Sequence, residues 1–248
     1  MIALGGGGFG PGDLLIERYI LAQAAPERPS IGFIPTATGD ADSYLVRFYS
    51  ASGRLDCRPS HLSLFTRTPD LREWVFGRDV IFVGGGNTRS LLGVWREWGL
   101  HEVLREAWQA GIVLSGVSAG AICWFEQGST DSWADRLRPL DCLGFLPGSC
   151  CPHYDAEPER RPTLHAMLGA GEIVPGIALD DDAAAHYAGT ELRRVVTARS
   201  TAGAYALSLA GGDVCETRLP AVDLSAAGAG GGYSEPLSDS SGSSTTRT

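Results

Sequence analysis

The chain has 248 residues, a formal net charge of −9 and 44% hydrophobic residues, which favours one folded acidic domain over a disordered chain or a nucleic-acid-binding protein. All 20 basic residues are Arg, so Schiff-base catalysis by Lys and the phosphate-binding lysine of a P-loop are excluded. No apolar run approaches the ~20 residues of a membrane span and no signal peptide precedes the first expected strand, so we expect a cytoplasmic protein without a membrane partner.

The first half of the chain alternates short apolar runs with segments of helical periodicity. The runs predict strands at residues 1–4, 31–34, 60–65, 79–83 and 112–115, and the periodic segments predict helices at 13–25, 40–52, 70–76, 88–98 and 101–110. Strands that alternate with helices are typical of an α/β fold with a mostly parallel sheet.

The second half has a different pattern. Residues 127–150 are expected to form an irregular loop, residues 158–169 a helix, and segments near 176–180, 184–188, 192–196 and 203–208 short strands joined by tight turns. These strands would extend the sheet with antiparallel edge strands. From residue 223 the composition is dominated by Gly, Ser, Ala and Thr, so we predict a catalytic domain over 1–222 and a disordered tail over 223–248.

Two features could suggest a cofactor or a metal. Gly5-x-Gly7-x-x-Gly10 matches the dinucleotide-binding pattern, but the second expected strand ends at Thr36 without the acidic residue that binds the ribose. The six Cys contain no C-x-x-C pair, and only Cys150, Cys151 and His153 come near the spacing of a zinc site. We therefore expect reduced thiols and neither cofactor nor metal.

A second glycine-rich turn, Gly84-Gly-Gly-Asn-Thr88, lies between a predicted strand and a predicted helix. Its glycines would let the backbone approach a ligand, and Thr88 is expected to cap the helix. Asn87 is the only Asn of the chain. We predict that this turn, with Asn87 and Thr88, faces a substrate.

The third turn, Gly116-Val-Ser-Ala-Gly120, fits the nucleophile elbow G-x-S-x-G. It follows a buried strand and precedes a helical run, the context in which the turn exposes the serine hydroxyl at the carboxyl end of the sheet. Ser118 is therefore the predicted nucleophile, and the amide of Ala119 is expected to point toward the oxyanion.

A serine nucleophile needs a base, which is usually His held by a third group. His153 is favoured among the five histidines because it lies in an extended, Pro-restricted segment after a predicted strand. His186 is the alternative, whereas His61, His101 and His165 are interpreted as surface or helix residues.

Two carboxylates are candidates for the group that orients the base. Asp131 is favoured because it lies in a predicted loop among hydroxyl side chains, and Glu126 is kept as the alternative. Asp180-Asp-Asp182 is interpreted as a solvated turn between short strands, although Asp180 could approach the site.

Together, the segments Val83–Thr88, Gly116–Gly120 and Pro152-His-Tyr154 resemble the peptidase E (aspartyl dipeptidase) and cyanophycinase family of serine peptidases, over about residues 1–210. The resemblance implies a three-layer α/β sandwich of the class I glutamine-amidotransferase-like (flavodoxin-like) type. It also implies a serine-type peptidase that forms an acyl-enzyme and hydrolyses dipeptides or short peptides, with N-terminal Asp as a possible requirement. Its partner would be a small peptide, and the protein a monomer or homodimer.

The resemblance also assigns roles to individual residues. Ser118 matches the nucleophile, His153 the base and Asp131 the acid of peptidase E, while Glu126 stays open because cyanophycinases use Glu. Gly85, Gly86 and Ala119 match the oxyanion-hole amides. Arg160 or Arg161 lies in about the place of the arginine that holds the aspartyl carboxylate of the substrate.

Two other classes of protein remain alternatives. A serine esterase of the α/β-hydrolase type shares the elbow, but it predicts a longer separation than that between Ser118 and His153, and an HGGG-type loop that the sequence lacks. A catalytically inactive binding protein of amidotransferase-like fold would keep the architecture without the reaction.

Overall fold

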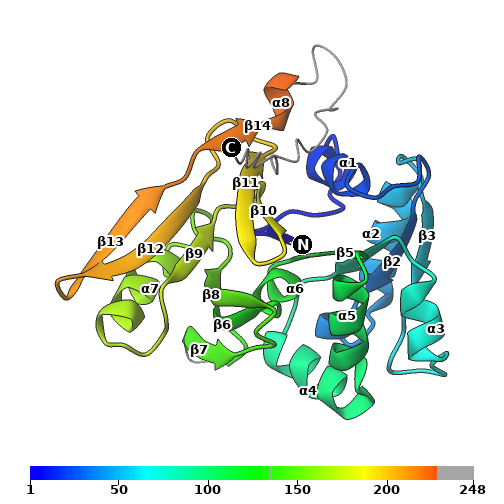
Figure 1. Cartoon of the computed structure of the whole chain (residues 1–248), viewed down its shortest axis with the longest axis horizontal. Coiled ribbons are helices and arrows are strands. Elements are labelled where there is room, and N and C mark those ends of the chain that lie inside the picture. Colours follow the sequence, from blue (N-terminus) through cyan, green and yellow to red (C-terminus); the bar gives the residue numbers. More distant parts are fainter. Residues whose placement is uncertain (134–135, 228–248) are drawn as a thin grey trace, which may run out of the picture.

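The computed structural model describes residues 1–133 and 136–227, and it contains two β-sheets (Figure 1). An eight-stranded sheet has the order β14-β11-β10-β1-β5-β4-β2-β3, and a six-stranded sheet has the order β13-β12-β9-β8-β6-β7. The chain passes between the two sheets four times: from β5 to β6, from β9 to β10, from β11 to β12 and from β13 to β14.

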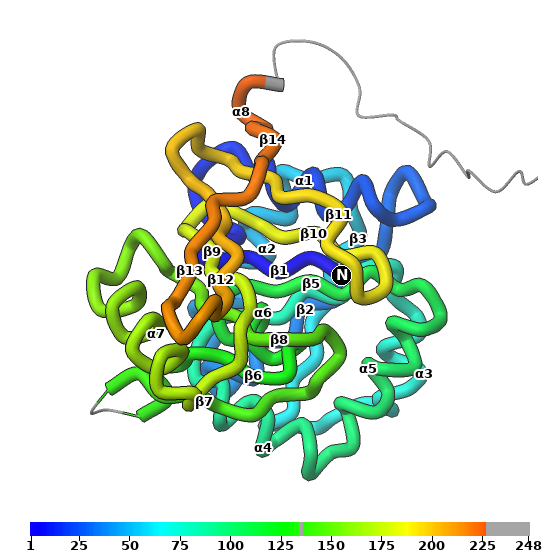
Figure 2. Tube along the Cα trace, turned by 60° about the vertical axis from the view of Figure 1, so that its left-hand side comes forward, coloured from blue at the N-terminus to red at the C-terminus, as the bar shows by residue number. Residues whose placement is uncertain are grey.

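The eight-stranded sheet is built mainly by the first half of the chain. Its strands are β1 (Ile2–Leu4), β2 (Ser30–Ile34), β3 (Arg58–His61), β4 (Val80–Val83), β5 (Val113–Val117), β10 (Ala183–Ala188), β11 (Glu191–Thr197) and β14 (Ala221–Asp223). From β1 to β3 every neighbouring pair is parallel, whereas β10 pairs antiparallel with both β1 and β11. Figure 2 shows β10, β1 and β5 running side by side through the centre of the molecule.

Helices cover both faces of this sheet because successive apolar residues of its strands point alternately to the two faces. Along β4, Val80 and Phe82 belong to one core cluster, and Ile81 and Val83 to the other. The first face is covered by α1 (Leu15–Leu21), α2 (Asp42–Ser52) and α8 (Leu224–Ala227), and the second by α3 (Leu71–Phe76), α4 (Thr88–Trp98), α5 (Leu100–Gln109) and α6 (Ala119–Ile122). The three-layer α/β sandwich with a mostly parallel sheet is thus confirmed.

The six-stranded sheet corrects the prediction of an irregular loop over 127–150. That region contains β6 (Phe125–Thr130), β7 (Arg138–Asp141) and β8 (Leu146–Cys151), and the sheet is completed by β9 (Gly176–Leu179), β12 (Ala204–Ala210) and β13 (Asp213–Arg218). Gly, Pro and polar residues interrupt β6, β7 and β8, so no strand periodicity is visible in the sequence. Helix α7 (Arg160–Gly169) packs against β12 and β13.

The helix starts differ from the predicted caps. The side-chain oxygen of Asn87, not Thr88, caps α4 by accepting from the Ser90 amide at 2.9 Å. Helix α1 has Leu14 at its N-cap, with φ 55°. Asn87 therefore has a structural role whatever it contributes to a substrate site.

The folded chain extends beyond the boundary predicted at residue 222. Asp223 belongs to β14, and Leu224 of α8 is 2% exposed and packs in the core beside α1. The rest of the predicted tail, residues 228–248, lies outside the described residues. All six cysteines have free thiols. Among the described helices, none combines the length and apolar character of a membrane span.

Candidate active site

Ser118 occupies a tight turn between β5 and α6. Its backbone has φ 55° and ψ −115°, a conformation that residues with a Cβ rarely adopt. Its amide donates to the carbonyl oxygen of Leu4 at 3.1 Å, and its own carbonyl oxygen accepts from the amides of Ala121 and Ile122 at 2.9 Å. The turn has the strand–turn–helix context that the nucleophile elbow requires.

Two glycines of the elbow are required by close backbone packing. A Cβ on Gly116 would meet the carbonyl group of Gly120, and a Cβ on Gly120 would meet the backbone of Val83 at the end of β4. Since only Gly lacks this atom, the sequence Gly116–Gly120 lets the turn lie directly against β4. The position of Ser118 is consequently set by main-chain contacts.

Gly85 and Gly86 line a cavity together with Ser118. A Cβ on Gly85 would lie 3.2 Å from the Ser118 Cβ and 3.7 Å from its Oγ, and Gly86 has φ 133° and packs against Ala37. Within the part of the chain that the structure describes, the amides of Gly85 and Gly86 donate to no other backbone group. The amide of Ala119 begins α6 and so has no intrahelical acceptor. That these three amides form an oxyanion hole stays a prediction.

His153 lies in the loop that follows β8. Its backbone is held by two bonds: the Tyr154 amide donates to the Leu179 carbonyl oxygen at 3.1 Å, and the Glu157 amide donates to the His153 carbonyl oxygen at 3.1 Å. The His153 ring lines the same two cavities as Ser118. The alternative base, His186, instead bonds through Nδ1 to the Tyr19 hydroxyl at 2.7 Å.

The carboxylate that contacts His153 is that of Asp181, with Oδ1 at 2.7 Å from Nδ1. Asp181 lies between β9 and β10, and β9 is the parallel neighbour of β8. Because the carboxyl ends of parallel neighbours meet at one edge, a residue following β8 and a residue following β9 come together. The bond occupies Nδ1 and leaves Nε2 as the nitrogen that can serve Ser118.

The two carboxylates that the sequence offered as the orienting acid have other partners in the structure. Asp131 lies 3.8 Å from Nη2 of Arg160, and Glu126 accepts from the Gly148 amide at 2.8 Å; neither bonds to His153. The sequence favours a solvated turn at Asp181 because no pattern in it predicts the pairing of β8 with β9. The available signal was its place directly after a predicted strand.

Gly6 packs against the bonded pair of side chains. It forms a β-bridge with Asp181, and a Cβ on Gly6 would collide with the Asp181 carboxylate and lie 2.8 Å from Nδ1 of His153. The glycine-rich turn after β1 thus has a physical task beside the site. It leaves room for the imidazole–carboxylate pair.

Arg199 and Asp155 hold the turn that carries Asp181. Arg199 donates to the Asp181 carbonyl oxygen at 3.0 Å, to Asp155 Oδ2 at 2.8 Å and to Asp182 Oδ2 at 3.3 Å, while Asp155 Oδ1 accepts from the Asp181 amide at 2.9 Å. Burial raises the pKa of Asp155, but the bonds from Arg199 and the Asp181 amide outweigh it and leave that pKa below its ordinary value.

The buried Asp180 carboxyl supports the same turn. Its Oδ2 accepts from the Gly203 amide at 2.8 Å and from the Tyr205 hydroxyl at 3.4 Å. Burial, and then the negative charge of Asp155, raises the pKa of Asp180. Asp180 therefore faces the interior, and its neighbour Asp181 faces the imidazole.

The two predicted substrate arginines have different surroundings. Arg160 is 1% exposed; its Nε donates to Glu157 at 2.7 Å and its Nη1 to the Ser129 carbonyl oxygen at 3.1 Å. Arg161 lies over the rings of Tyr154 and Tyr205 and does not reach the Ser118 site. Of these two arginines, Arg160 lines a cavity with Ser118 and Arg161 does not.

Asn87 and Thr88, the two predicted substrate residues of the Gly84–Thr88 turn, also have different surroundings. Asn87 lines a cavity beside Ser118, and its amide nitrogen donates to the Ser132 carbonyl oxygen at 3.2 Å. Thr88 is buried, and its hydroxyl bonds to that of Thr130 at 3.2 Å. Thr88 therefore joins α4 to β6 and does not face the site.

Two cavities meet at Ser118, His153 and Gly86. The polar cavity, of about 310 Å³, is completed by Asn87, Asp131, Ser132 and Arg160. The aromatic cavity, of about 220 Å³, is completed mainly by Phe9, Phe33, Phe48, Phe82, Tyr44 and Arg47. A molecule that crosses Ser118 would thus contact a polar wall on one side and an aromatic wall on the other.

The chain is similar to known peptidases in sequence. The model of the family described as "Peptidase family S51" matches residues 1–195. A Bacillus subtilis (strain 168) protein named "Uncharacterized peptidase YgaJ" is 52% identical over 223 residues, which cover 89% of this chain and 96% of that protein.

More distant relatives share part of the sequence or the fold. "Peptidase E" of Streptomyces coelicolor is 30% identical over 138 residues, covering 54% of this chain and 55% of that protein. The solved structure of a peptidase from an acI-B1 Actinobacterium has a TM-score of 0.68 at 20% identity and covers 89% of this chain and 93% of that one, which shows a common fold.

Proposed function

Because this chain belongs to peptidase family S51 and is a peptidase, we propose that it is a serine peptidase that hydrolyses dipeptides or short peptides through an acyl-enzyme. The catalytic groups of the proposal are Ser118, His153 and Asp181. The observation that carries it is the His153–Asp181 bond of 2.7 Å, since it fixes the imidazole with Nε2 free beside the cavities that Ser118 lines.

The proposed reaction has two steps. In the first, Oγ of Ser118 bonds to the carbonyl carbon of the peptide, its proton passes to Nε2 of His153, and that proton goes to the amine that leaves as the C–N bond breaks. In the second, water gives a proton to His153 and attacks the ester, which frees the acid and returns the proton to Ser118. Asp181 orients the imidazole and stabilises its charged form.

The negative charge that forms on the carbonyl oxygen needs donors in both steps. The amides of Gly86 and Ala119 are the proposed donors, with Gly85 bringing the turn close to Ser118. Such fixed amides stabilise the tetrahedral intermediate more than the ground state, which is what lowers the barrier. No side chain is needed for this task.

The test of the proposal combines covalent labelling with hydrolysis. We expect a fluorophosphonate to add to Ser118, detected by mass spectrometry of the digested protein, and a panel of dipeptides to be cleaved. Ser118→Ala should lose the label and lower kcat by about 10⁴-fold or more. Hydrolysis that survives Ser118→Ala in the purified protein would contradict the assignment.

The same experiment separates the two alternatives. An esterase would turn over acyl esters while leaving dipeptides intact, and a catalytically inactive binding protein would neither take the label nor cleave either substrate. Cleavage of dipeptides with labelling at Ser118 excludes both.

A finer part of the proposal concerns N-terminal Asp. Nη2 of Arg160 faces the polar cavity, but Glu157 at 2.7 Å and Asp131 at 3.8 Å already balance its charge. We therefore propose that N-terminal Asp is accepted and not required. Rates for Asp-Leu, Asn-Leu and Ala-Leu test this, because a preference for Asp-Leu over Asn-Leu of about 100-fold or more would show that Arg160 pairs with the substrate.

A further inference from the structure

We propose that the aromatic cavity binds the side chain of the residue that follows the scissile bond, and that it selects a large apolar or aromatic side chain at the free carboxyl end of a dipeptide. This inference rests on the proposed peptidase reaction and names its substrate class. It is carried by the walls of the aromatic cavity, by the arginine at its rim and by the opposite charge of the polar cavity.

The walls of the aromatic cavity are phenylalanine rings. Phe9 makes edge contacts with Phe48 and Phe82 at centroid distances of 5.0 and 4.6 Å, and Phe33 stacks on Phe48 at 4.8 Å. All four rings are at most 5% exposed, so packing among themselves fixes their positions. The cavity therefore has a preformed aromatic wall beside the nucleophile.

Its size suits one aromatic side chain. The volume of about 220 Å³ exceeds the ~150 Å³ of an engineered apolar cavity that binds benzene. A phenyl or leucyl side chain would therefore fill most of the space, whereas a methyl group would leave much of it empty. Filling an apolar cavity of this kind is worth about 10-fold or more in kcat/KM.

Glycines keep this cavity open next to Ser118. A Cβ on Gly84 would lie 3.0 Å from Cζ of Phe33, and a Cβ on Gly8, whose φ is 81°, would lie 3.4 Å from Cζ of Phe82. Both glycines expose the ring atoms to the cavity where other residues would cover them. The two glycine-rich turns thus open an approach from the rings to the nucleophile.

Arg47 lies at the rim and supplies the charge that a free carboxyl terminus needs. It belongs to α2 and is exposed, with its guanidinium 5.5 Å from the centre of the Tyr44 ring. Among the residues that the structure describes, no carboxylate pairs with it. A guanidinium can bind both oxygens of a carboxylate, so Arg47 is a suitable partner for the C-terminal group of a dipeptide.

The opposite side of Ser118 carries the complementary charge. Asp131 and Arg160 both line the polar cavity; the guanidinium of Arg160 also pairs with Glu157 at 2.7 Å, and the Asp131 side chain is 65% exposed. The exposed carboxylate of Asp131 favours the α-ammonium of the N-terminal residue. A dipeptide would then lie with its ammonium near Asp131 and its carboxylate near Arg47, which places the second side chain in the aromatic cavity.

The first test is a dipeptide series that varies only the second residue. We expect kcat/KM to rise from Ala-Ala to Ala-Leu and Ala-Phe, with Ala-Phe about 10-fold or more above Ala-Ala, and Ala-Asp to be the poorest substrate. A flat series, or a preference for Ala-Ala or Ala-Asp, would overturn the inference. A failure to cleave any peptide or to label Ser118 would instead overturn the proposed function.

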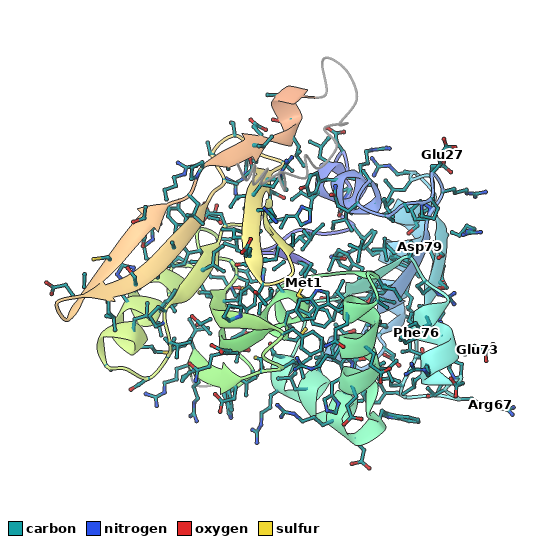
Figure 3. The ribbon with its side chains drawn as sticks, viewed as in Figure 1. Met1, Glu27, Arg67, Glu73, Phe76 and Asp79 are labelled. Carbon is teal, nitrogen blue, oxygen red and sulfur yellow. The ribbon has the colours of Figure 1, made fainter. Side chains whose placement is uncertain are left out.

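The second test addresses the rim. Arg47→Met should lower kcat/KM for Ala-Phe by about 10-fold and change it by less than about 2-fold for Ala-Phe-amide, which has no carboxylate. Arg67→Met is the matched control, because Arg67 is an exposed arginine at the periphery beside α3 (Figure 3). Equal losses for the acid and the amide, or equal effects of the two variants, would show that Arg47 does not bind the terminal carboxylate.

Discussion

The proposed nucleophile and the proposed base come from different sheets and are held in different ways. Ser118 follows β5 of the eight-stranded sheet, where its position is set by glycines that let main chains touch. His153 and Asp181 follow β8 and β9 of the six-stranded sheet, where charged side chains hold the turn. The nucleophile side should therefore respond to added volume, and the base side to changes of charge.

The difference also has a consequence for assembly of the site. The Ser118 side and the His153 side touch where Gly6, which follows β1, forms a β-bridge with Asp181. Ser118, His153 and Gly86 line both cavities. Catalysis thus depends on the relative placement of two sheets. The following predictions test whether each side behaves as its contacts indicate.

The largest expected effect is on the base side. Asp181→Asn keeps the volume of the side chain but removes the charge that orients and stabilises the imidazole, so kcat should fall by about 10⁴-fold. Steady-state hydrolysis of the best dipeptide measures it. Glu126→Gln is the matched control and should retain kcat within about 10-fold. The opposite ranking would mean that His153 is oriented by Glu126 during turnover.

The nucleophile side should be most sensitive to a single methyl group. Gly120→Ala places a Cβ against the backbone of Val83, which cannot move as a side-chain tip can, and should lower the free energy of unfolding by about 3 kcal/mol. Gly93→Ala in α4 is the control, because its Cβ would meet nothing within 4 Å and should raise stability by about 0.5 to 1 kcal/mol. Similar urea-unfolding midpoints for the two variants would contradict the role of close packing.

The eight-stranded and six-stranded sheets also differ in how well the sequence predicts them. The apolar runs at 31–34 and 79–83 are continuous and mark buried parallel strands, and the elbow around Ser118 has a local pattern, so this side can be predicted. The six-stranded sheet cannot be predicted in this way, because Gly, Pro and polar residues break the apolar pattern of β6 to β8. Asp181 was missed for that reason: its contact with His153 depends on a strand pairing and not on a motif.

A third prediction concerns the place where the two sides touch. Gly6→Ala puts a methyl group against the Asp181 carboxylate and Nδ1 of His153, which must shift the pair. Because a displacement of about 1 Å can cost a factor of 10², we expect kcat to fall by about 100-fold while the unfolding midpoint changes little. Gly10→Ala is the control in the same turn, since nothing lies within 4 Å of its Cβ. Unchanged kcat in Gly6→Ala would show that the pair tolerates movement.

A smaller effect is expected from the side chain that holds the acid-bearing turn. Arg199→Met removes the bonds to Asp155, Asp182 and the Asp181 carbonyl oxygen, but the side chain is 39% exposed and water can replace part of them. We expect kcat to fall by about 10-fold with little change in KM. Moderate salt should leave the kcat of the wild-type protein almost unchanged. If Arg199→Met kept the wild-type kcat, Arg199 would contribute to stability alone.

The smallest effect distinguishes the two candidate bases. Burial, with the positive charges of the N-terminal amino group and Arg194, lowers the pKa of His186 from 6.5 to about 4, because the charged ring is disfavoured when folded. The unfolded chain then binds this proton first, so the free energy of unfolding should be highest above pH 6.5 and fall by about 1 kcal/mol as the pH drops to 4. His186→Gln should reduce that fall and keep kcat within about 2-fold.

His61→Gln is the matched control, because His61 bonds to Tyr49 at the surface as His186 bonds to Tyr19. A loss of kcat in His186→Gln comparable to that of His153→Gln would show that His186, in the eight-stranded sheet, is the base. The nucleophile and the base would then belong to the same sheet.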